Sequence, residues 1–168
     1  MQFRVEQRIV GDVDSVARAF TDPDYYVKLG ELPKLGTPTL LERVEEGGTV
    51  KLRIRFRFTG HLSPAARAVL DPAKLTWVEV STHDLAARRV QFRMIADHYR
   101  DRFRCSGAYW FESVGDGQTR RTSEGDVTVK TPFVGRVVEQ AIISGLREHL
   151  EAEVAVMEGF VATDSGTG

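Results

Sequence analysis

Two polar side chains lie four residues apart in the middle of the most regular apolar segment of the chain. His149 and Glu153 fall on the apolar face of a predicted helix, between Ile142 on one side and Phe160 on the other. Side chains at this spacing can meet. An imidazole titrates near neutral pH, so the pair suits either a general base or an anchor for a polar group of a ligand. A third interpretation is a satisfied structural pair, because a buried polar group without a partner is costly.

Inward positions of the predicted strands mix large and small residues. One strand places Gly107 and Tyr109 on one face, and the next strand places Ser123 and Gly125 on the corresponding face. Small inward residues leave space in a core, and a tyrosine hydroxyl can present a hydrogen-bonding group there. Ordinary core packing is the alternative interpretation. The predicted ligand-binding set is Phe56, Phe92, Gly107, Tyr109, Ser123, Ile142, His149 and Glu153.

Metal and cofactor chemistry find no support in the residue pattern. The other histidines, His61, His83 and His98, fall in predicted loops or at strand ends, whereas a metal site needs three or four converging ligands. The single cysteine, Cys105, excludes an internal disulfide and a multi-cysteine zinc site, and we interpret it as a small buried residue. We therefore expect no metal and no cofactor, and we assign no catalytic residue.

The arginines of the chain suggest a second kind of site, which the sequence does not favour. Arg53, Arg55 and Arg57 alternate with apolar residues, so they are expected on the solvated face of a half-buried strand. Arg120 and Arg121 receive the same interpretation. The chain has 23 basic and 24 acidic residues, and this balance argues against nucleic-acid binding.

The elements that position these residues follow from apolar periodicity and capping signals. Asp12 is expected to cap a helix that ends at Phe20, and Asp22 with Pro23 starts a second helix that ends at Leu29. A helical turn is expected over 63–70. Seven strands are expected, over 3–9, 40–46, 49–59, 75–82, 88–96, 103–114 and 118–130. One long helix over 132–161 is expected to follow them.

This order of elements resembles the START-like superfamily, also called Bet v 1-like or SRPBCC, over residues 2–161. The local marks are the helix over 12–20 with the TDPDYY segment that follows it at 21–26, and the TPF helix start at 131–133. The opening residues 1–8 look most like a bacterial branch of the superfamily that is known only as a domain of unknown function.

The resemblance implies an α+β helix-grip fold. In this fold a curved antiparallel sheet of about seven strands surrounds a long C-terminal helix, with two short helices after strand one. The superfamily includes lipid carriers, hormone and pigment binders, aromatic polyketide cyclases and co-chaperones. It has no common motif that fixes chemistry, so no catalytic residue is carried over.

The expected function is non-covalent binding or transport of a hydrophobic or amphipathic small molecule, lipid-like or polyketide-like, in an internal cavity. One alternative is a cyclase- or hydratase-type enzyme with His149 or Tyr109 as acid or base. The other alternative is a co-chaperone-like interaction module that uses the outer face of the sheet.

The expected organisation is one domain over residues 1–162 and a disordered tail over 163–168. The sequence contains no run of 18 apolar residues, so no integral membrane segment is predicted. The first residues start directly in strand-like alternation, without a secretory pattern, so a cytoplasmic location is expected. The sequence leaves the oligomeric state open.

Overall fold

A computed structural model describes residues 1–60, 64–68 and 70–164 of the chain. Asp12 and Asp22 cap the first two helices through their side chains, and Pro23 begins the second, as the sequence predicts. The elements in chain order are β1 (Gln2–Val10), α1 (Val13–Ala19), α2 (Pro23–Leu29), β2 (Thr39–Glu46), β3 (Thr49–Arg57), α3 (Pro64–Arg67), η1 (Pro72–Lys74), β4 (Thr76–Asp84), β5 (Arg89–Ala96), β6 (Phe103–Ser113), β7 (Gln118–Val129) and α4 (Gly135–Asp164). Ser63, at which a helical turn was expected to begin, lies outside the described residues.

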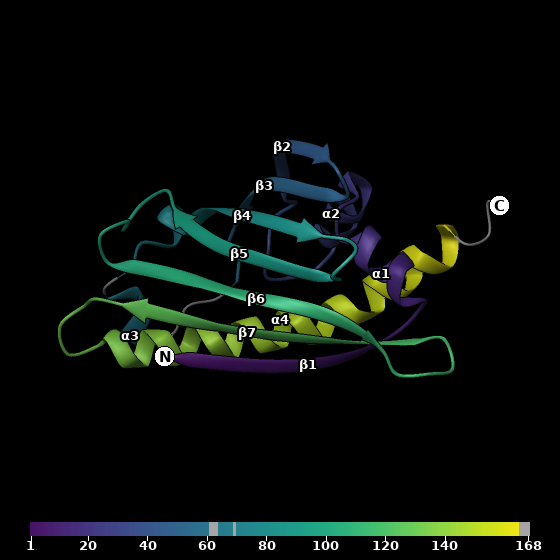
Figure 1. Cartoon of the computed structure of the whole chain (residues 1–168). Helices are drawn as coiled ribbons and strands as arrows, with labels where there is room; N and C mark the ends of the chain where they lie inside the picture. Colours follow the sequence, from purple (N-terminus) through teal and green to yellow (C-terminus); the bar gives the residue numbers. More distant parts are fainter. Residues whose placement is uncertain (61–63, 69, 165–168) are drawn as a thin grey trace.

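The seven strands form one antiparallel sheet in the order β1-β7-β6-β5-β4-β3-β2. Figure 1 shows this sheet curving over α4, with α1 and α2 beside the C-terminal half of the helix. The predicted helix-grip architecture is confirmed. Its consequence for function is that one face of the sheet, called the inner face below, is turned toward a single helix.

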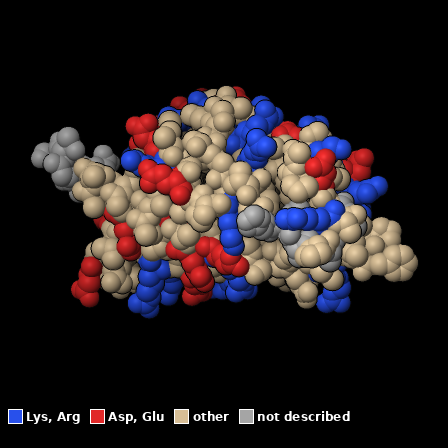
Figure 2. Space-filling model, turned by 180° about the vertical axis from the view of Figure 1, so that it is seen from behind, with Lys and Arg blue, Asp and Glu red and all other residues tan. Residues whose placement is uncertain are grey.

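Strict alternation fixes which side chains reach the inner face. Every second residue of β1 is buried, and β3 repeats this pattern up to Arg57. The predicted solvent positions of Arg53, Arg55 and Arg57 are confirmed, because all three side chains are exposed. Figure 2, which views the molecule from behind Figure 1, shows acidic and basic side chains intermixed over that side.

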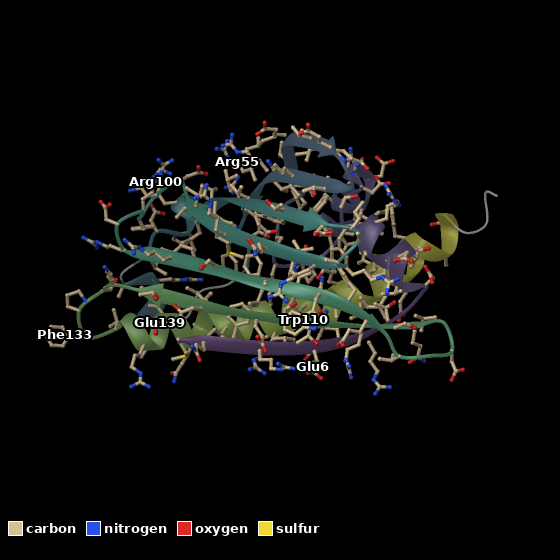
Figure 3. All side chains as sticks on the ribbon, viewed as in Figure 1. Glu6, Arg55, Arg100, Trp110, Phe133 and Glu139 are labelled. Carbon is tan, nitrogen blue, oxygen red and sulfur yellow. The ribbon has the colours of Figure 1, made fainter. Side chains whose placement is uncertain are left out.

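The outer face of the sheet carries charged and aromatic side chains. Trp110 of β6 lies on this face between the guanidinium groups of Arg89 and Arg4, which lie 5.3 and 6.0 Å from the indole ring (Figure 3). Arg4 is also paired with Glu6 and Glu124. A shallow groove of about 800 Å³ runs over these residues.

The long helix begins later and turns a different face to the sheet than the sequence predicts. Pro132 to Val134 form a turn in which Phe133 has a φ of +66° and is fully exposed at the end of the molecule (Figure 3). Ala141, an apolar residue of the expected helix over 132–161, is exposed, and Ile142 is half-buried. The fully buried row of α4 is Val138, Ile143, Leu150, Glu153, Met157 and Val161.

Three buried residues of α4, Ile143, Leu150 and Met157, are spaced seven apart and define the face that the sheet covers. The predicted face differs because its direction was averaged over every apolar residue of the helix, including Ala141. The helix also continues to Asp164, beyond the expected end at 161. The remaining part of the predicted tail, 165–168, lies outside the described residues.

Two inward glycines have no free space beside them, because neighbouring atoms fill it. Gly107 and Gly125 are paired across β6 and β7. A side chain on Gly107 would place its Cβ 2.1 Å from the backbone oxygen of Glu124, and one on Gly125 would lie 2.7 Å from the ring of Phe3. Backbone and aromatic ring therefore occupy the room that the sequence argument attributed to these glycines.

Candidate functional site

A polar layer divides the interior into two apolar clusters. Along β1, Gln7 lies between Val5 of one cluster and Ile9 of the other. Along α4, Glu153 lies between Leu150 and Met157, which again belong to different clusters. Gln7 and Glu153 are both buried. Polar groups this deep need partners, so their hydrogen bonds define the layer.

Arg121 of β7 is the centre of this layer. Its Nη2 donates to the carboxylate of Glu153, and its Nε donates to Oε1 of Gln7 at 2.6 Å. The hydroxyl of Tyr25, from α2, donates to the second carboxylate oxygen of Glu153 at 2.7 Å. Gln7 in turn donates to the backbone carbonyl of Leu150. Four elements, β1, β7, α2 and α4, are thus joined by one network.

The sequence-based interpretation of Arg121 as a surface residue is wrong. The side chain is 3% exposed, and its guanidinium lies 4.5 Å from the ring centre of Phe20. Arg121 pairs with Gln7 and Phe111, which are both inward residues, so its inward direction follows from strand parity. The same parity had already placed Ser123 inside. Arg120, its neighbour, does lie on the outer face and pairs with Glu112.

The network shifts the ionisation of Glu153. Burial by itself raises the pKa of this carboxyl, but the charge of Arg121, the nearby His149 and the two donated hydrogen bonds outweigh burial and lower it. Burial and the adjacent carboxylate raise the pKa of Tyr25 well above its ordinary value. Glu153 is therefore an ionised, fully bonded structural group.

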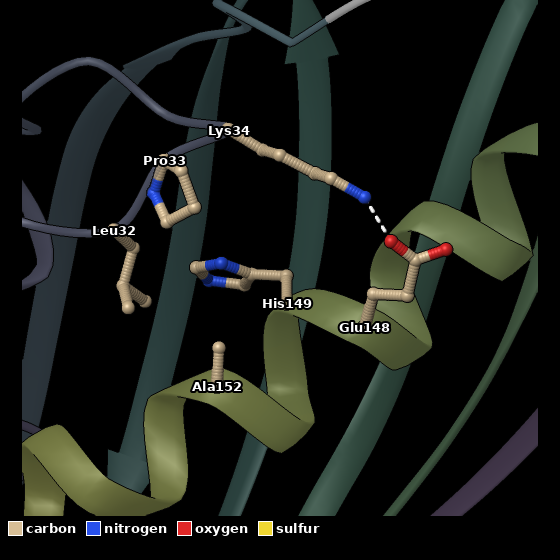
Figure 4. Close-up of a pocket in the computed structure, with 6 residues that line it drawn as sticks. All are labelled: Leu32, Pro33, Lys34, Glu148, His149 and Ala152. Carbon is tan, nitrogen blue, oxygen red and sulfur yellow. Dashed lines mark hydrogen bonds and ion pairs between the residues drawn. The ribbon is translucent and has the colours of Figure 1, made fainter.

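His149 has no hydrogen bond to this network, although it lies close enough for the charges of Glu153 and Arg121 to act on it, and it lines a pocket at the surface of α4. The pocket has a volume of about 190 Å³ (Figure 4). Lys34 and Glu148 form an ion pair across it. No hydrogen bond or ion pair joins His149 to Glu153, both of which the structure describes. The lining residues are Leu32, Pro33, Lys34, Glu148, His149 and Ala152.

The protonation of His149 follows from its position. Burial lowers the pKa of the imidazole, and the charge of Glu153 opposes that shift only in part. The side chain is therefore neutral at pH 7. A neutral, half-buried imidazole beside Leu32 suits packing at a pocket wall.

A row of polar side chains on the inner face of β4 was missed by the sequence argument. Trp77, Glu79, Ser81 and His83 alternate along this strand, and their cross-strand partners on β3 are inward apolar residues. Trp77, for example, stacks on Phe56 with ring centres 5.7 Å apart and an interplanar angle of 13°. The register with β3 thus turns four hydrogen-bonding groups toward the interior.

Most of these groups lack a partner among the described residues. The Nε1 of Trp77 and the Nδ1 of His83 are buried without a hydrogen bond. The Nε2 of His83 lies 2.9 Å from the hydroxyl of Ser81. In the described part of the chain, no hydrogen bond is found for the carboxylate of Glu79 or for the hydroxyls of Tyr109 and Ser123. Five polar groups of the inner face therefore have no hydrogen-bond partner among the described residues.

Glu79 is the only acidic residue of this row, and the pKa of its carboxyl is shifted. Burial, reinforced by the charge of Glu153, raises its pKa to about 7 although Arg121 opposes the shift. The side chain keeps part of its surface accessible although protein surrounds the carboxyl. Burial lowers the pKa of His83 to about 4, so this imidazole is neutral.

Tyr109 connects the β4 row to the polar layer. Its ring lies 6.2 Å from His83 in an edge-on arrangement and 6.1 Å from Phe92, and Arg121 lies 5.6 Å from its centre. Burial and the charge of Glu79 raise the pKa of its hydroxyl well above the ordinary value. At neutral pH this hydroxyl is a hydrogen-bond donor.

The eight predicted site residues are distributed over five places. Four lie on the inner face of the sheet, namely Phe56, Phe92, Tyr109 and Ser123. Ile142 packs against the second apolar cluster, and Glu153 belongs to the polar layer. His149 lines the surface pocket, and Gly107 lines the groove described above.

No metal site is formed by the described residues, because no group of three or more histidine, cysteine or acidic side chains converges among them. Among the helices of the described residues, none is both long and apolar enough to cross a membrane.

The fold is shared with solved structures of several activities. The protein TTHA0849 from Thermus thermophilus aligns with a TM-score of 0.70 and 18% identity over 98% of this chain and 99% of its own. The Zhui aromatase/cyclase from Streptomyces sp. R1128 aligns with a TM-score of 0.67 and 13% identity over 96% and 93%. Norcoclaurine synthase from Thalictrum flavum, in complex with dopamine and hydroxybenzaldehyde, aligns with a TM-score of 0.64 and 18% identity over 97% and 87%.

These identities establish the START-like fold alone. No match was found among curated proteins. A family model, in contrast, matches almost the whole chain, over residues 4–161. The chain therefore belongs to the family described as a protein of unknown function, DUF2505.

Proposed function

We propose that this protein binds a small, mainly apolar molecule on the inner face of the sheet and holds it by a few polar contacts. The observation that carries this proposal is the set of inward polar groups without a partner on β4, β6 and β7. They are the indole of Trp77, the carboxyl of Glu79, the imidazole of His83 and the hydroxyls of Tyr109 and Ser123.

A purely structural interior would not retain these groups. A buried donor or acceptor without a partner costs about 1–3 kcal/mol, so several of them together are a burden unless water or a ligand satisfies them. In the polar layer of the same interior, the structural groups are paired: Arg121 donates to Glu153 and Gln7, and both carboxylate oxygens of Glu153 accept a hydrogen bond. The contrast between the two sets supports a binding role for the β4 row.

The apolar part of the site suits a flat guest. Phe56 stacks on Trp77, and Phe92 lies beside Tyr109, so aromatic rings flank the unpartnered groups. Apolar walls with a few convergent polar groups are typical of small-molecule sites. The norcoclaurine synthase structure, which shares this fold, holds two small aromatic molecules, dopamine and hydroxybenzaldehyde. That likeness supports an aromatic or amphipathic guest here.

A proton-transfer enzyme of the cyclase type is the second candidate, and Glu79 favours it. A carboxyl with a pKa of about 7 can exchange a proton at neutral pH, and Tyr109 supplies a donor nearby. The Zhui aromatase/cyclase shares the fold. This candidate transfers the acid–base role from His149 to Glu79. The charged outer face gives less support to an interaction module.

Native mass spectrometry of the freshly purified protein tests the binding proposal. We expect a bound small molecule, seen as a mass that is lost on mild activation. A matched variant, Ser123→Val, should fold because valine fits an inward strand position, yet retain less of the bound species. A protein that carries no small molecule and binds none from a panel of aromatic probes would contradict the proposal. A cytoplasmic location and a lack of nucleic-acid binding remain predictions.

A further inference from the structure

We propose that Glu79 is an ammonium anchor: it holds the protonated amine of an aromatic or otherwise apolar ligand on the inner face of the sheet. This inference rests on the proposed binding function and names the chemical class of the guest. Glu79 lies between Trp77 and Ser81 on β4, opposite Ile54 on β3 and Met94 on β5. The carboxyl is therefore set in a mainly apolar and aromatic wall.

The interior offers Glu79 no cation of its own. Among the described residues, Arg121 is the one buried arginine or lysine, and its bonds to Glu153 and Gln7 are already made. The positive charge of Arg121 is balanced by Glu153. An ionised Glu79 is thus an excess negative charge in a low-dielectric space, which a cationic guest would neutralise.

The histidines do not supply that charge either. Burial lowers the pKa of His83 to about 4, and its Nε2 is occupied by Ser81. Burial also lowers the pKa of His149. The titratable and charged groups coupled to Glu79 are Tyr26 of α2, Cys105 and Tyr109 of β6, Arg121 of β7 and Glu153 of α4, and His83 lies on the same face of β4. Of these, only Arg121 is a cation at neutral pH.

The aromatic surroundings favour an ammonium over other donors. Phe56, Trp77, Phe92 and Tyr109 lie on the same face of the sheet as Glu79, and a cation gains from the face of a ring in addition to its bond with a carboxylate. A neutral alcohol gains only the hydrogen bond. A ligand carboxylate would meet the charge of Glu79 and is disfavoured.

The test uses Trp77 as an interior reporter. The chain has two tryptophans, so Trp110→Phe on the outer face leaves Trp77 as the only one. Fluorescence titrations at pH 8 compare 2-phenylethylamine with 2-phenylethanol, which has the same shape without the charge. We expect the amine to bind at least tenfold more tightly, and the preference to shrink when the pH is lowered to 5, where Glu79 is protonated.

Two variants in that background separate the anchor from general effects. Glu79→Gln should abolish the preference for the amine while leaving the affinity for 2-phenylethanol within about twofold. Glu112→Gln, an exposed carboxyl on the outer face, is the matched control and should change neither affinity. As a measurement independent of variants, carbon NMR of the wild-type carboxyls should report a lower pKa for Glu79 when 2-phenylethylamine is added.

The outcomes distinguish this inference from the function on which it rests. Equal binding of amine and alcohol, or a preference that survives Glu79→Gln, overturns the anchor while the binding function stands. Binding of neither probe, with no bound species in native mass spectrometry, overturns both. An unchanged Glu79 pKa in the presence of bound amine also overturns the anchor, whatever the stability of the variant.

Discussion

The guanidinium of Arg121 is bonded to the carboxylate of Glu153 in the middle of the fold, and both side chains are less than 10% exposed. This ion pair connects the sheet to the long helix. Tyr25 donates a further hydrogen bond to Glu153, and Gln7 accepts one from Arg121. The pair therefore fixes how α4 sits against β7 and leaves the β4 row as the polar part of the interior without a structural role.

Breaking this ion pair is expected to be costly. Glu153→Leu removes one partner and leaves the guanidinium of Arg121 buried without a counter-charge, so the free energy of unfolding should fall by about 3–5 kcal/mol. The double variant Glu153→Leu with Arg121→Met should recover most of that loss, because two apolar residues can fill the space. Urea unfolding of the three proteins measures both effects. A double variant no more stable than Glu153→Leu would contradict the interpretation.

Two buried groups should give opposite pH dependences that partly cancel. The pKa of Glu79 rises on folding from its ordinary 4.5 to about 7, so its contribution to stability is present below pH 4.5 and is lost as the pH rises through 7. The pKa of His83 falls from 6.5 to about 4, so its contribution is present above pH 6.5 and is lost as the pH falls through 4. Each effect amounts to at most about 3 kcal/mol.

Glu79→Gln should expose the contribution of His83 alone. The variant is expected to be more stable than wild type at pH 8, where the wild-type carboxylate is ionised and buried, and nearly equal to it at pH 4.5. Its stability should fall steadily between pH 6.5 and 4. Chemical unfolding at several pH values measures this, with Glu112→Gln as an exposed control. A variant as pH-independent as the wild type would argue against a buried carboxyl at position 79.

The glycines allow a test of close approach in the sheet. Gly107→Ala would place a methyl group against the backbone of β7, and we expect a loss of at least about 2 kcal/mol in the free energy of unfolding. Gly159→Ala on α4 is the matched control, because no atom lies within 4 Å of the added methyl group. It should stabilise the helix by about 0.5–1 kcal/mol. Thermal unfolding of both variants suffices, and equal effects would contradict the close approach.

The fold was predictable because local signals agreed with one another. Asp12, Asp22 and Pro23 mark two helix starts, and alternation in β1 and β3 fixes their buried faces. Gly115, Asp116 and Gly117, two of which are glycines, form the turn between β6 and β7 with positive φ at all three residues. The same alternation, applied to β7, predicts that Arg121 points inward. Its type, rather than its position, suggested a surface residue, because the partner that compensates its burial comes from a distant element.

The inward direction of the β4 row could not be predicted from the sequence, for a different reason. Val78 and Val80 alternate with Trp77 and Glu79, and valines ordinarily mark the buried face. Only the pairing of β4 with the apolar positions of β3 turns the other set inward. Register depends on the strand order of the whole sheet, which no local pattern contains. The phase of α4 was missed similarly, since the curvature of the sheet decides which residues it covers.

His149 gives the last prediction, because it separates a wall residue from an acid–base group. Its imidazole lies at the pocket with Leu32 and has no bond to Glu153, so His149→Leu should change the free energy of unfolding by less than about 1 kcal/mol. Glu79→Gln, in contrast, should alter amine binding, while His149→Leu should leave it within about twofold. Unfolding and probe titrations of the two variants side by side make the comparison. A selective loss of amine binding in His149→Leu would move the polar anchor from β4 back to the long helix.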